Sequence, residues 1–582
     1  MSNVNGEPGI TRKKPIWKRF LKDQKGTVLQ LLALSALPMF LAVGAAVDMM
    51  RASREQTAFY GAVDAAALAI AGDDRSATVG VDATTLATNK VALEALARKY
   101  ILADYKADSG QAPNITTDVT ITGQSVVLQS SLTFPTTIMS LAGVQSMTIN
   151  ASSTIKKAMR PIELTMVMDT TGSMASGGKI AGAKSAAHTL LNTIYSGSLA
   201  TTQRSEFLRV SLVPFAAAVR LDPNAYDFEQ SWIDTNGDNP LSKLNFDPAA
   251  PAAWNNYYAW SRLKANNTTN LAWNGCVEAR MRGTAAANTD YNVNDIAPSQ
   301  TNPVTLFPAY FAPDTPTNSN GSSNYGYNYV QPTGTPNEFT GLLPAVTGSY
   351  ATADLLTKQR NWRKYDGRLV GTEAAPSYGS GPWSGCAASK VVPMTYDRAS
   401  VETGIDAMTA NGPTLIAEGL AWGWRTISPG APFTKVQGSG SIPANTISGY
   451  GDPRWQKVMI LMTDGDNDLS AGSYGYNNTT YSAYGFAGET GALNRFGTTS
   501  SAAVMTELDN QLLNVCQKVK DAGIELYVTS FGTGVSTTTK NRLQACATDA
   551  SHYANSTTPG DLVSFFDHVG ANVLNKMIYV SK

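Results

Sequence analysis

The sequence predicts an α/β fold in which the strands of a parallel sheet alternate with helices. Four strand-length runs rich in apolar residues, at 162–168, 208–215, 457–463 and 524–531, are separated along the chain by longer segments. Nearly continuous apolar runs of this length are typical of parallel strands that are buried on both faces. Helices between such strands imply right-handed crossovers, and ligands of these sheets bind beyond the carboxyl ends of the strands.

The segments between and after the runs supply the helices. Apolar residues recur at helical spacing in 415–426, 501–521 and 562–575, and a further helix-like segment begins shortly after Met174. The alternation of strands and helices therefore extends from about Pro161 to the C-terminus.

A candidate cation site directly follows the first run. Asp169, Thr171 and Ser173 place one carboxylate and two hydroxyls at alternate positions, and Gly172 permits a tight backbone turn. Oxygen ligands of this kind suit Mg²⁺, which usually keeps several waters and can accept another ligand from outside. The pattern on its own is also typical of an ordinary helix N-cap, because Asp, Ser and Thr cluster in strand-to-helix turns.

Two later segments complete the pattern. Thr414 lies in a loop at the start of 415–426, and Asp464 follows the run 457–463. The three pieces resemble the metal-ion-dependent adhesion site of the von Willebrand factor type A family, whose pattern is Asp-x-Ser-x-Ser, a loop threonine and an aspartate after a later strand. Thr171 stands where the family commonly has serine, and its hydroxyl serves equally well. The resemblance implies these metal ligands: Asp169, Thr171, Ser173, Thr414 and Asp464.

The same resemblance implies a Rossmann-like von Willebrand factor type A domain at 159–582, with a long irregular insertion at about 217–393. The implied cofactor is Mg²⁺, with Mn²⁺ and Ca²⁺ as alternatives. The implied activity is protein binding, in which a carboxylate of the partner completes the coordination of the ion, so we expect the chain not to be an enzyme. A metal-assisted hydrolase is one alternative, although it needs a general base beside the ion. A passive envelope scaffold with a structural ion is another.

The N-terminal region predicts a membrane anchor. The segment 27–47 carries no charged residue, and as a helix it is long enough to cross the roughly 30 Å hydrocarbon layer. Basic residues crowd the segment 12–25, which places residues 1–26 in the cytoplasm and the bulk of the chain on the opposite side. A cleaved signal peptide competes with this interpretation, but its apolar core normally has only about 7 to 15 residues.

Residues 48–72 consist mainly of strong helix formers and continue the membrane helix to Gly72. The N-terminal region resembles the N-terminus of TadE/TadG-like proteins of the Flp (tight adherence) pilus system, and the resemblance is carried by segments 25–27, 44–48 and 62–69. Together with the type A domain, the resemblance is to TadG-like pilus assembly proteins. It implies a single-pass protein of the bacterial inner membrane, with a cytoplasmic N-terminus, a periplasmic bulk and protein partners among pilus-assembly or envelope components.

The sequence around Gly26 bears on N-terminal processing. Pilin-like members of that system have Glu five residues after the cleaved glycine, whereas Gly26 is followed at that distance by Leu31, so we expect no cleavage by a prepilin peptidase.

The global charge of the chain bears on its partners. The 45 basic and 45 acidic residues balance, and this global charge does not favour a nucleic-acid partner.

The region 48–158 is predicted to form a helical stalk followed by a small α+β module. Apolar residues at helical spacing predict a helix at 84–106. Alternation and β-branched residues predict strands at 115–119, 125–132 and 147–155.

The insertion at 217–393 is dense in Asn, Gly, Pro, Ser, Thr, Tyr and Trp. Its composition is compatible with a solvated loop and equally with a partner-binding surface, because Tyr and Trp give large contact area with few rotors.

The four cysteines predict disulfides, since an even number on the non-cytoplasmic side fits an oxidising compartment. Chain order favours the pairs Cys276–Cys386 and Cys516–Cys546, although three connectivities are possible and four free buried thiols are the alternative.

Other candidate chemistry is weaker. His188, His552 and His568 show no metal spacing and no nearby nucleophile motif. The segment 234–239 begins like a calcium loop, but Asn239 replaces the required glycine, so a polar turn is the better interpretation.

Overall fold

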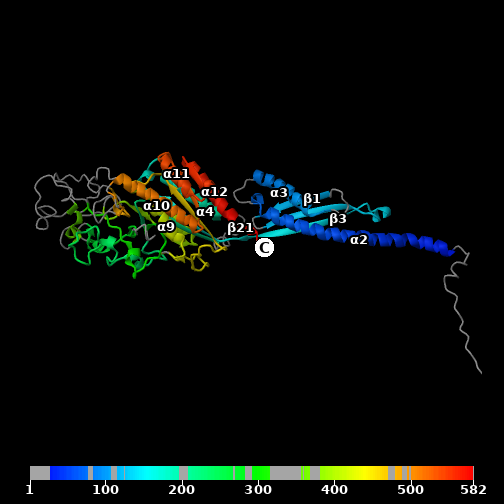
Figure 1. Cartoon of the computed structure of the whole chain (residues 1–582), viewed down its shortest axis with the longest axis horizontal. Coiled ribbons are helices and arrows are strands. Elements are labelled where there is room, and N and C mark those ends of the chain that lie inside the picture. The colour runs from blue at the N-terminus through cyan, green and yellow to red at the C-terminus, as the bar shows by residue number, and fades with distance from the viewer. Residues whose placement is uncertain are drawn as a thin grey trace, which may run out of the picture. The chain divides into compact units, whose positions relative to one another are not determined.

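The chain forms two compact units, which we call unit 1 (residues 1–157 and 580–582) and unit 2 (158–579). The basic segment 12–25 and Gly26 lie outside the described residues. The computed structural model (Figure 1) describes residues 27–76, 83–106, 114–122, 125–195, 207–265, 269–281, 291–314, 329, 356–357, 359–367, 381–430, 432–469, 479–487, 495–496, 498 and 500–580.

Unit 1 begins with the helix α2 (Thr27–Ala71), which continues without interruption through Pro38. The part of this helix from Leu31 onward is long and apolar enough to cross a membrane, which suits an anchor and equally a signal sequence. Apolar side chains between Leu31 and Met50 are largely exposed, whereas most of those from Phe59 onward are buried. The apolar segment and the folded part of unit 1 therefore share one helix, as the sequence predicts.

The rest of unit 1 is the predicted α+β module. The helix α3 (Ala83–Asp104) packs against the C-terminal half of α2, and both cover a sheet whose strand order is β1-β2-β3-β21. The neighbours β1–β2 and β2–β3 are antiparallel. Phe59, Leu93 and Ile101 are completely buried in the shared core. The strands are β1 (Asn114–Ile121), β2 (Ser125–Pro135), β3 (Ser146–Met159) and β21 (Ile578–Val580).

Unit 2 is built on a nine-stranded mixed sheet whose centre is parallel. The four predicted strands lie side by side with a fifth, in the order β5-β4-β16-β19-β20, and each pair in this run is parallel. Nearly every residue of the three central strands is buried, which explains why their sequences are almost continuously apolar. The strands are β4 (Ile162–Asp169), β5 (Leu208–Phe215), β16 (Gln456–Thr463), β19 (Glu525–Phe531) and β20 (Tyr553–Ser556).

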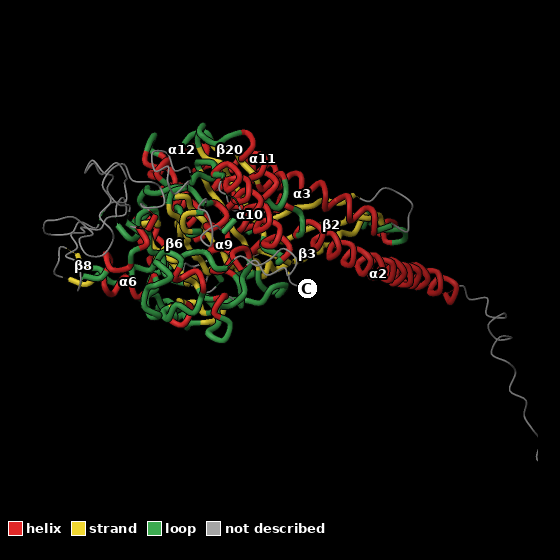
Figure 2. The backbone as a smooth tube through the Cα atoms, turned by 60° about the vertical axis from the view of Figure 1, so that its left-hand side comes forward, coloured by secondary structure: helices red, strands yellow, loops and turns green. Residues whose placement is uncertain are grey.

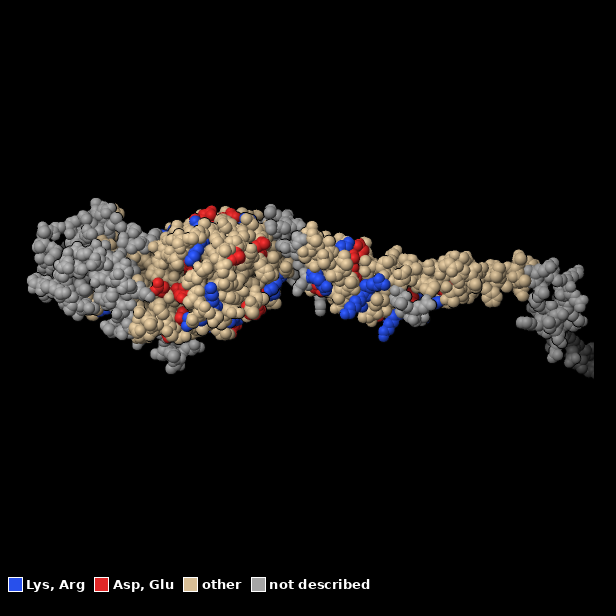
Figure 3. Space-filling view, turned by 90° about the horizontal axis from the view of Figure 1, so that it is seen from above, with Lys and Arg blue, Asp and Glu red and all other residues tan. Residues whose placement is uncertain are grey.

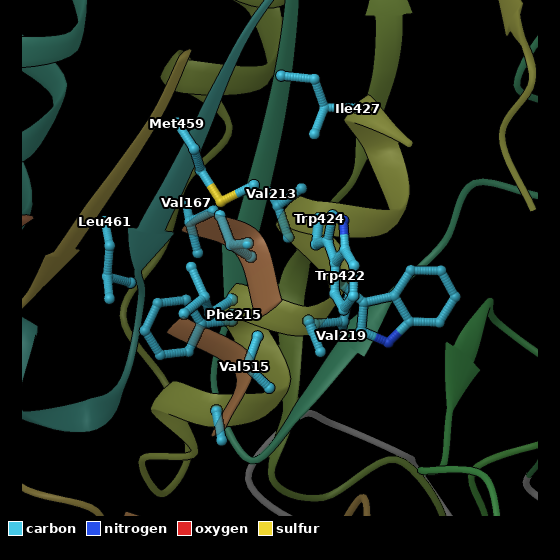
Figure 4. Close-up of a cluster of buried hydrophobic side chains, with 14 of the residues drawn as sticks. Val167, Val213, Phe215, Val219, Trp422, Trp424, Ile427, Met459, Leu461 and Val515 are labelled. Carbon is cyan, nitrogen blue, oxygen red and sulfur yellow. The ribbon is translucent and has the colours of Figure 1, made fainter. Parts of the chain in front are cut away.

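Helices cover both faces of this sheet (Figure 2). On one face Val167, Phe215 and Met459 point toward a cluster that includes Trp422 and Val515 (Figure 4). These last two residues come from α9 and α10, which therefore cover that face. On the other face α4 and α12 pack on each other. The helices of unit 2 are α4 (Lys179–Tyr195), α6 (Asn256–Arg262), α8 (Arg398–Asp406), α9 (Ile416–Ile427), α10 (Ser501–Asp521), α11 (Thr537–Cys546) and α12 (Pro559–Met577).

The described part of 217–393 differs from the expected irregular insertion. Short strands from this segment extend the sheet beyond β5, because β6 pairs with β5 and in turn with β10 and β12. Trp254, Trp260 and Phe311 form a separate buried aromatic cluster. Composition was compatible with a solvated loop and with a partner-binding surface, whereas several Trp and Tyr side chains of the described part pack in this core. The short strands are β6 (Ala218–Arg220), β7 (Ile233–Asp234), β8 (Lys264–Ala265), β9 (Thr269–Asn270), β10 (Cys276–Val277), β11 (Phe307–Pro308), β12 (Cys386–Lys390), β13 (Val392–Thr395), β14 (Lys435–Val436), β15 (Asn445–Thr446), β17 (Tyr481–Ser482) and β18 (Gly485–Phe486).

Both favoured disulfides are confirmed. Cys276 bonds to Cys386 and joins two short strands that flank β6. Cys516 bonds to Cys546 and links α10 to α11. Each cross-link shortens the loops available to the unfolded chain, which stabilises the folded state.

A buried ionic cluster fixes the amino ends of the central strands. The carboxylate of Glu163 accepts a hydrogen bond from Arg209 at 2.8 Å and one from the ammonium of Lys457, so three neighbouring strands contribute to it. Ser448 adds a backbone and a hydroxyl donor at 2.9 and 2.8 Å. The Arg209 guanidinium also stacks 3.7 Å from the ring centroid of Trp455. The cluster satisfies a carboxylate that is completely buried.

We predict that Glu163→Gln lowers the free energy of unfolding by about 3–5 kcal/mol, because it leaves two buried cations without their counter-charge. Urea unfolding of the full chain in nanodiscs measures the change. The matched control is Asp452→Asn, which removes an ion pair to Arg454, a side chain that is 81% exposed. We expect the control to leave the unfolding midpoint unchanged, and equal losses in both variants would contradict the prediction.

Candidate metal site

Two carboxylates meet at the carboxyl edge of the parallel sheet. Asp169 is the last residue of β4, and Asp464 directly follows β16, the strand beside it. Because Met168 and Met462 are register partners, the chain leaves both strands at the same level. Both aspartates are almost completely buried. The sequence-based prediction of two acids at one sheet edge is therefore met by the structure.

The Asp169 carboxylate is held in place by its own loop and by β16. Its Oδ1 accepts the backbone N–H of Thr171 at 2.8 Å, an Asx-type turn that begins the loop. Its Oδ2 accepts the hydroxyl of Thr463 at 2.7 Å. Thr463 was not singled out from the sequence, although its position one residue before Asp464 places it at the same edge.

Two predicted hydroxyl ligands lie next to these carboxylates. Thr171 precedes the short 3-10 helix η3 (Gly172–Ala175), which carries Ser173. The two hydroxyl oxygens are 3.0 Å apart, and the Ser173 hydroxyl donates to Asp464 Oδ1 at 2.5 Å. Thr171 is buried and Ser173 is exposed, so the site opens to solvent on the side of Ser173.

Thr414 completes the group from a third segment. Its backbone pairs with that of Asp468 in both directions, at 3.1 and 3.3 Å, which ties the loop before α9 to the loop after β16. A Cβ built on Gly465 would lie 3.7 Å from the Ser173 hydroxyl and 3.7 Å from the Thr414 hydroxyl. Both hydroxyl oxygens therefore lie beside Gly465, and all five predicted residues lie in this part of the molecule.

Close backbone contacts fix the position of the Thr414 loop relative to the two segments beside it. The N–H of Gly172 donates to the carbonyl of Gly412 at 2.8 Å. Gly412 has φ +86°, and a Cβ there would meet the carbonyl oxygen of Gly385 at 2.8 Å. Gly385 directly precedes the disulfide-bonded Cys386. The loop that carries Thr414 therefore packs against a segment that is held by the disulfide. The turn-forming Asn411–Gly412–Pro413 is the only sequence signal for this contact.

A lysine that the sequence analysis did not single out also reaches the site. The ammonium of Lys179 lies 2.7 Å from Asp464 Oδ2, and its side chain is 20% exposed. Lys179 is the first residue of α4, where a positive charge opposes the helix dipole. A lysine at such a position indicates that another interaction offsets the unfavourable contact with the helix dipole. Here that interaction is the ion pair with Asp464.

The electrostatics of the site favour an added cation. Burial, and after it the neighbouring Asp464 charge, raises the pKa of Asp169 to about 6. One ammonium therefore faces two buried carboxylates, which leaves a negative charge in a place with little water. A divalent cation would offset this negative charge and leave one net positive charge, which a further carboxylate ligand would neutralise.

The donor set fits a hard cation. Two oxygens bound at right angles to one Mg²⁺ at about 2.1 Å lie about 3 Å apart, which is close to the Thr171–Ser173 spacing of 3.0 Å. Among the described residues no group of three or more His, Cys, Asp or Glu side chains is arranged to hold a metal, so a soft-metal or histidine site does not compete there. Binding of an ion by these five residues stays a prediction.

The other candidates have structural partners elsewhere. His188 contacts Asp406, His552 contacts Glu525 and Asp549, and His568 contacts Asn572.

The calcium-like segment is a polar turn, as predicted. The Asp234 carboxylate accepts the backbone N–H groups of Gly237, Asp238 and Asn239 and the hydroxyl of Ser242.

Comparison with known proteins gives distant structural matches. The chain matches no family model and no curated protein sequence. The pilus adhesin SpaC from Lactobacillus rhamnosus GG, in its open conformation, matches with a TM-score of 0.30 and 9% identity, over 82% of this chain and 36% of the adhesin. The vWF domain of the type V pili tip protein Mfa5 from Porphyromonas gingivalis matches with a TM-score of 0.28 and 10% identity, over 71% of this chain and 95% of that domain.

The pilus adhesin RrgA from Streptococcus pneumoniae matches with a TM-score of 0.26 and 9% identity, over 78% of this chain and 48% of the adhesin. The chain thus spans only about a third of SpaC and half of RrgA. At these identities and TM-scores the functions of the matched proteins do not transfer to this chain.

We predict that Asp169→Asn abolishes stabilisation by Mg²⁺ without unfolding the protein. The amide can still accept from Thr171, and it removes a buried charge, so the metal-free variant is at least as stable as the wild type. At a Mg²⁺ concentration of about 100 times the dissociation constant, the wild type gains about 2.7 kcal/mol, and the variant gains none. Thermal unfolding of the full chain with Mg²⁺ or with a chelator measures this, with the exposed Asp521→Asn as control. Equal gains in all three proteins would refute the site.

We predict that Lys179→Met tightens Mg²⁺ binding by about three- to tenfold, because the ammonium competes for Asp464 and repels the ion. Calorimetric titration of the full chain gives the affinity. Lys184→Met is the matched control, since Lys184 lies on the same helix and donates to the backbone carbonyl of Asp406. A weaker affinity in Lys179→Met would mean that this lysine supports the ion site.

Proposed function

We propose that this chain is a membrane-anchored, metal-dependent protein-binding component of Flp/Tad-type pilus assembly or anchoring, and that unit 2 is a von Willebrand factor type A domain. One observation carries the proposal. Five oxygen-bearing side chains from three separate segments gather at the carboxyl edge of a parallel sheet, where such sheets bind their ligands.

The residues have distinct roles in this proposal. The hydroxyls of Thr171, Ser173 and Thr414 hold the ion directly or through water, according to the state of the site. Asp169 and Asp464 supply the charge, and Asp169, whose oxygens already accept protein donors, acts through water. When bound, Mg²⁺ supplies an open coordination position that takes a carboxylate oxygen of the partner. Ser173 lies on the exposed side, so the partner approaches there.

Binding is favoured over hydrolysis for a specific reason. A metal-assisted hydrolase needs a general base within hydrogen-bond reach of the attacking water. The carboxylate of Asp464 is occupied by Ser173 and Lys179, and that of Asp169 by Thr171 and Thr463. The contacts of the three histidines lie elsewhere.

The anchor and the disulfides support the proposed location. The apolar segment of α2 continues into the core of unit 1, so removal of a leader within it would cut a folded helix. Two disulfides suit an oxidising compartment such as the bacterial periplasm. We therefore infer that the N-terminus lies in the cytoplasm, and that the part of unit 1 after the apolar segment and the whole of unit 2 lie on the periplasmic side of the inner membrane.

We predict that partner capture by the full-length chain in nanodiscs requires both Mg²⁺ and Asp169. Bacterial envelope proteins are passed over the wild type, Asp169→Asn and Asp521→Asn, each with Mg²⁺ and with a chelator, and bound proteins are identified. A specific partner should be retained at least tenfold better by the wild type and the control in Mg²⁺ than under any other condition. Capture that survives both the substitution and the chelator would contradict the proposed mechanism.

A second readout separates binding from a passive scaffold. Cells that carry Asp169→Asn should assemble at least tenfold fewer pili at a normal level of the protein in the membrane. Unchanged pilus numbers would favour the scaffold, in which the ion only stabilises the loops.

A further inference from the structure

An apolar loop projects from unit 1 at the end of the antiparallel pair β2 and β3. We call residues 136–145 the hairpin tip. This segment contains no charged residue. Within it Leu141 is 81% exposed and Val144 is 40% exposed. Leu141 belongs to the short 3-10 helix η2 (Met139–Ala142), and Val144 follows it by two residues.

The hairpin tip is fixed to the helix α2 by a buried carboxylate. Asp48 is 2% exposed, and it accepts the backbone N–H groups of Thr137, Ile138 and Met139 at 3.2, 2.9 and 2.8 Å. Arg51, one turn further along α2, donates to the hydroxyl of Thr137. These contacts determine which part of α2 lies beside the tip.

A close backbone approach extends this contact toward the apolar segment. A Cβ built on Gly44 would lie 2.0 Å from Cγ2 of Ile138, so only glycine lets the tip lie this near to α2. Gly44 is three residues before Val47, the expected end of the membrane-spanning segment. At 1.5 Å per residue, Ile138 therefore lies about 4–5 Å inside that end.

The surface of α2 around the tip is apolar and open. Phe40, Val43 and Val47 are 74%, 61% and 39% exposed. Figure 3 shows the N-terminal part of α2 without Lys, Arg, Asp or Glu on the face in view. Arg51 and Arg54 follow one to two turns later, where lipid phosphates would lie if the apolar segment spans the bilayer.

We propose that the hairpin tip is a second membrane contact, which inserts Leu141 and Val144 into the interfacial layer of the bilayer that α2 spans. The inference rests on the proposed membrane anchor. Amphipathic segments at interfaces bury their apolar side chains about 5–10 Å into the headgroup and acyl boundary, and the depth of Ile138 beside Gly44 lies at the shallow end of that range. With Val47 at the boundary, the tip cannot avoid the headgroups, because Asp48 and Gly44 hold it against the helix.

Continuity of the apolar surface favours lipid over a protein partner. The tip contains no charged residue, its Ile138 lies against Gly44, and the neighbouring α2 side chains Val43 and Val47 are apolar and exposed. Two contacts, one helix and one loop, would fix the tilt and rotation of unit 1 on the membrane, which a single helix leaves free. The tip thus fixes the orientation of the folded part of unit 1 relative to the membrane.

Lipid quenching tests this directly. The full chain is prepared with a single added cysteine at Leu141, Phe40 or Val91, each labelled with an environment-sensitive NBD probe and placed in phosphatidylcholine–phosphatidylglycerol nanodiscs. Val91 is the matched control, since it is a 65% exposed apolar residue of unit 1 on α3. Half of each sample contains lipid with a nitroxide near the headgroup. We expect at least twofold quenching at position 141 and at position 40, and less than 10% at position 91.

The three positions separate the possible failures. Quenching at position 40 without quenching at position 141 would overturn the proposed membrane contact of the hairpin tip, while leaving the membrane anchor in place. A blue-shifted but unquenched probe at 141 would mean that protein, such as a second copy of this chain, covers the tip, and it would also overturn the proposal. Absence of quenching at both 40 and 141 would reject the anchor itself, and equal quenching at all three positions would show unspecific contact.

Discussion

The parallel pairing of β4 with β16 is the constraint on which the rest of unit 2 depends. It brings Asp169 and Asp464 to the same edge, where both are buried at the point where their strands end. Two buried carboxylates repel each other, so the surrounding segments supply donors: Thr171, Thr463, Ser173 and Lys179. The buried Glu163 cluster holds the amino ends of the same strands. The geometry of the site is therefore set by the sheet as a whole.

The central strands and the main helices were predictable from the sequence because their burial leaves a direct pattern. Strands buried on both faces need nearly continuous apolar runs, and β4, β5 and β16 fall where such runs occur. Helix α10 occupies Ser501–Asp521, as its apolar spacing indicates. The positions of Asp169 and Asp464 were predictable for a related reason, because a carboxylate directly after a buried strand lies at the sheet edge. Thr171, Ser173 and Thr414 were joined to them only by the resemblance to the type A family.

What the sequence could not supply depends on contacts between distant segments. Lys179 reaches Asp464 across 285 positions of sequence, and nothing local distinguishes it from a surface lysine except its unfavourable place at a helix start. The strands contributed by 217–393 are only two to five residues long, which is too short for a periodic pattern. The position of the hairpin tip beside α2 could not be predicted either, because it depends on contacts with Asp48 and Gly44, which are distant in sequence.

The central claim is that the five gathered residues bind a hard cation. Anomalous scattering from a crystal of the full chain grown with Mn²⁺ tests it most directly, because the ion is located independently of any activity. The account predicts one ion within about 2.0–2.3 Å of the Ser173 hydroxyl and of at least one of the Thr171 and Thr414 hydroxyls. An ion located elsewhere, or an empty site with the Lys179 ammonium still on Asp464 at saturating Mn²⁺, would contradict it.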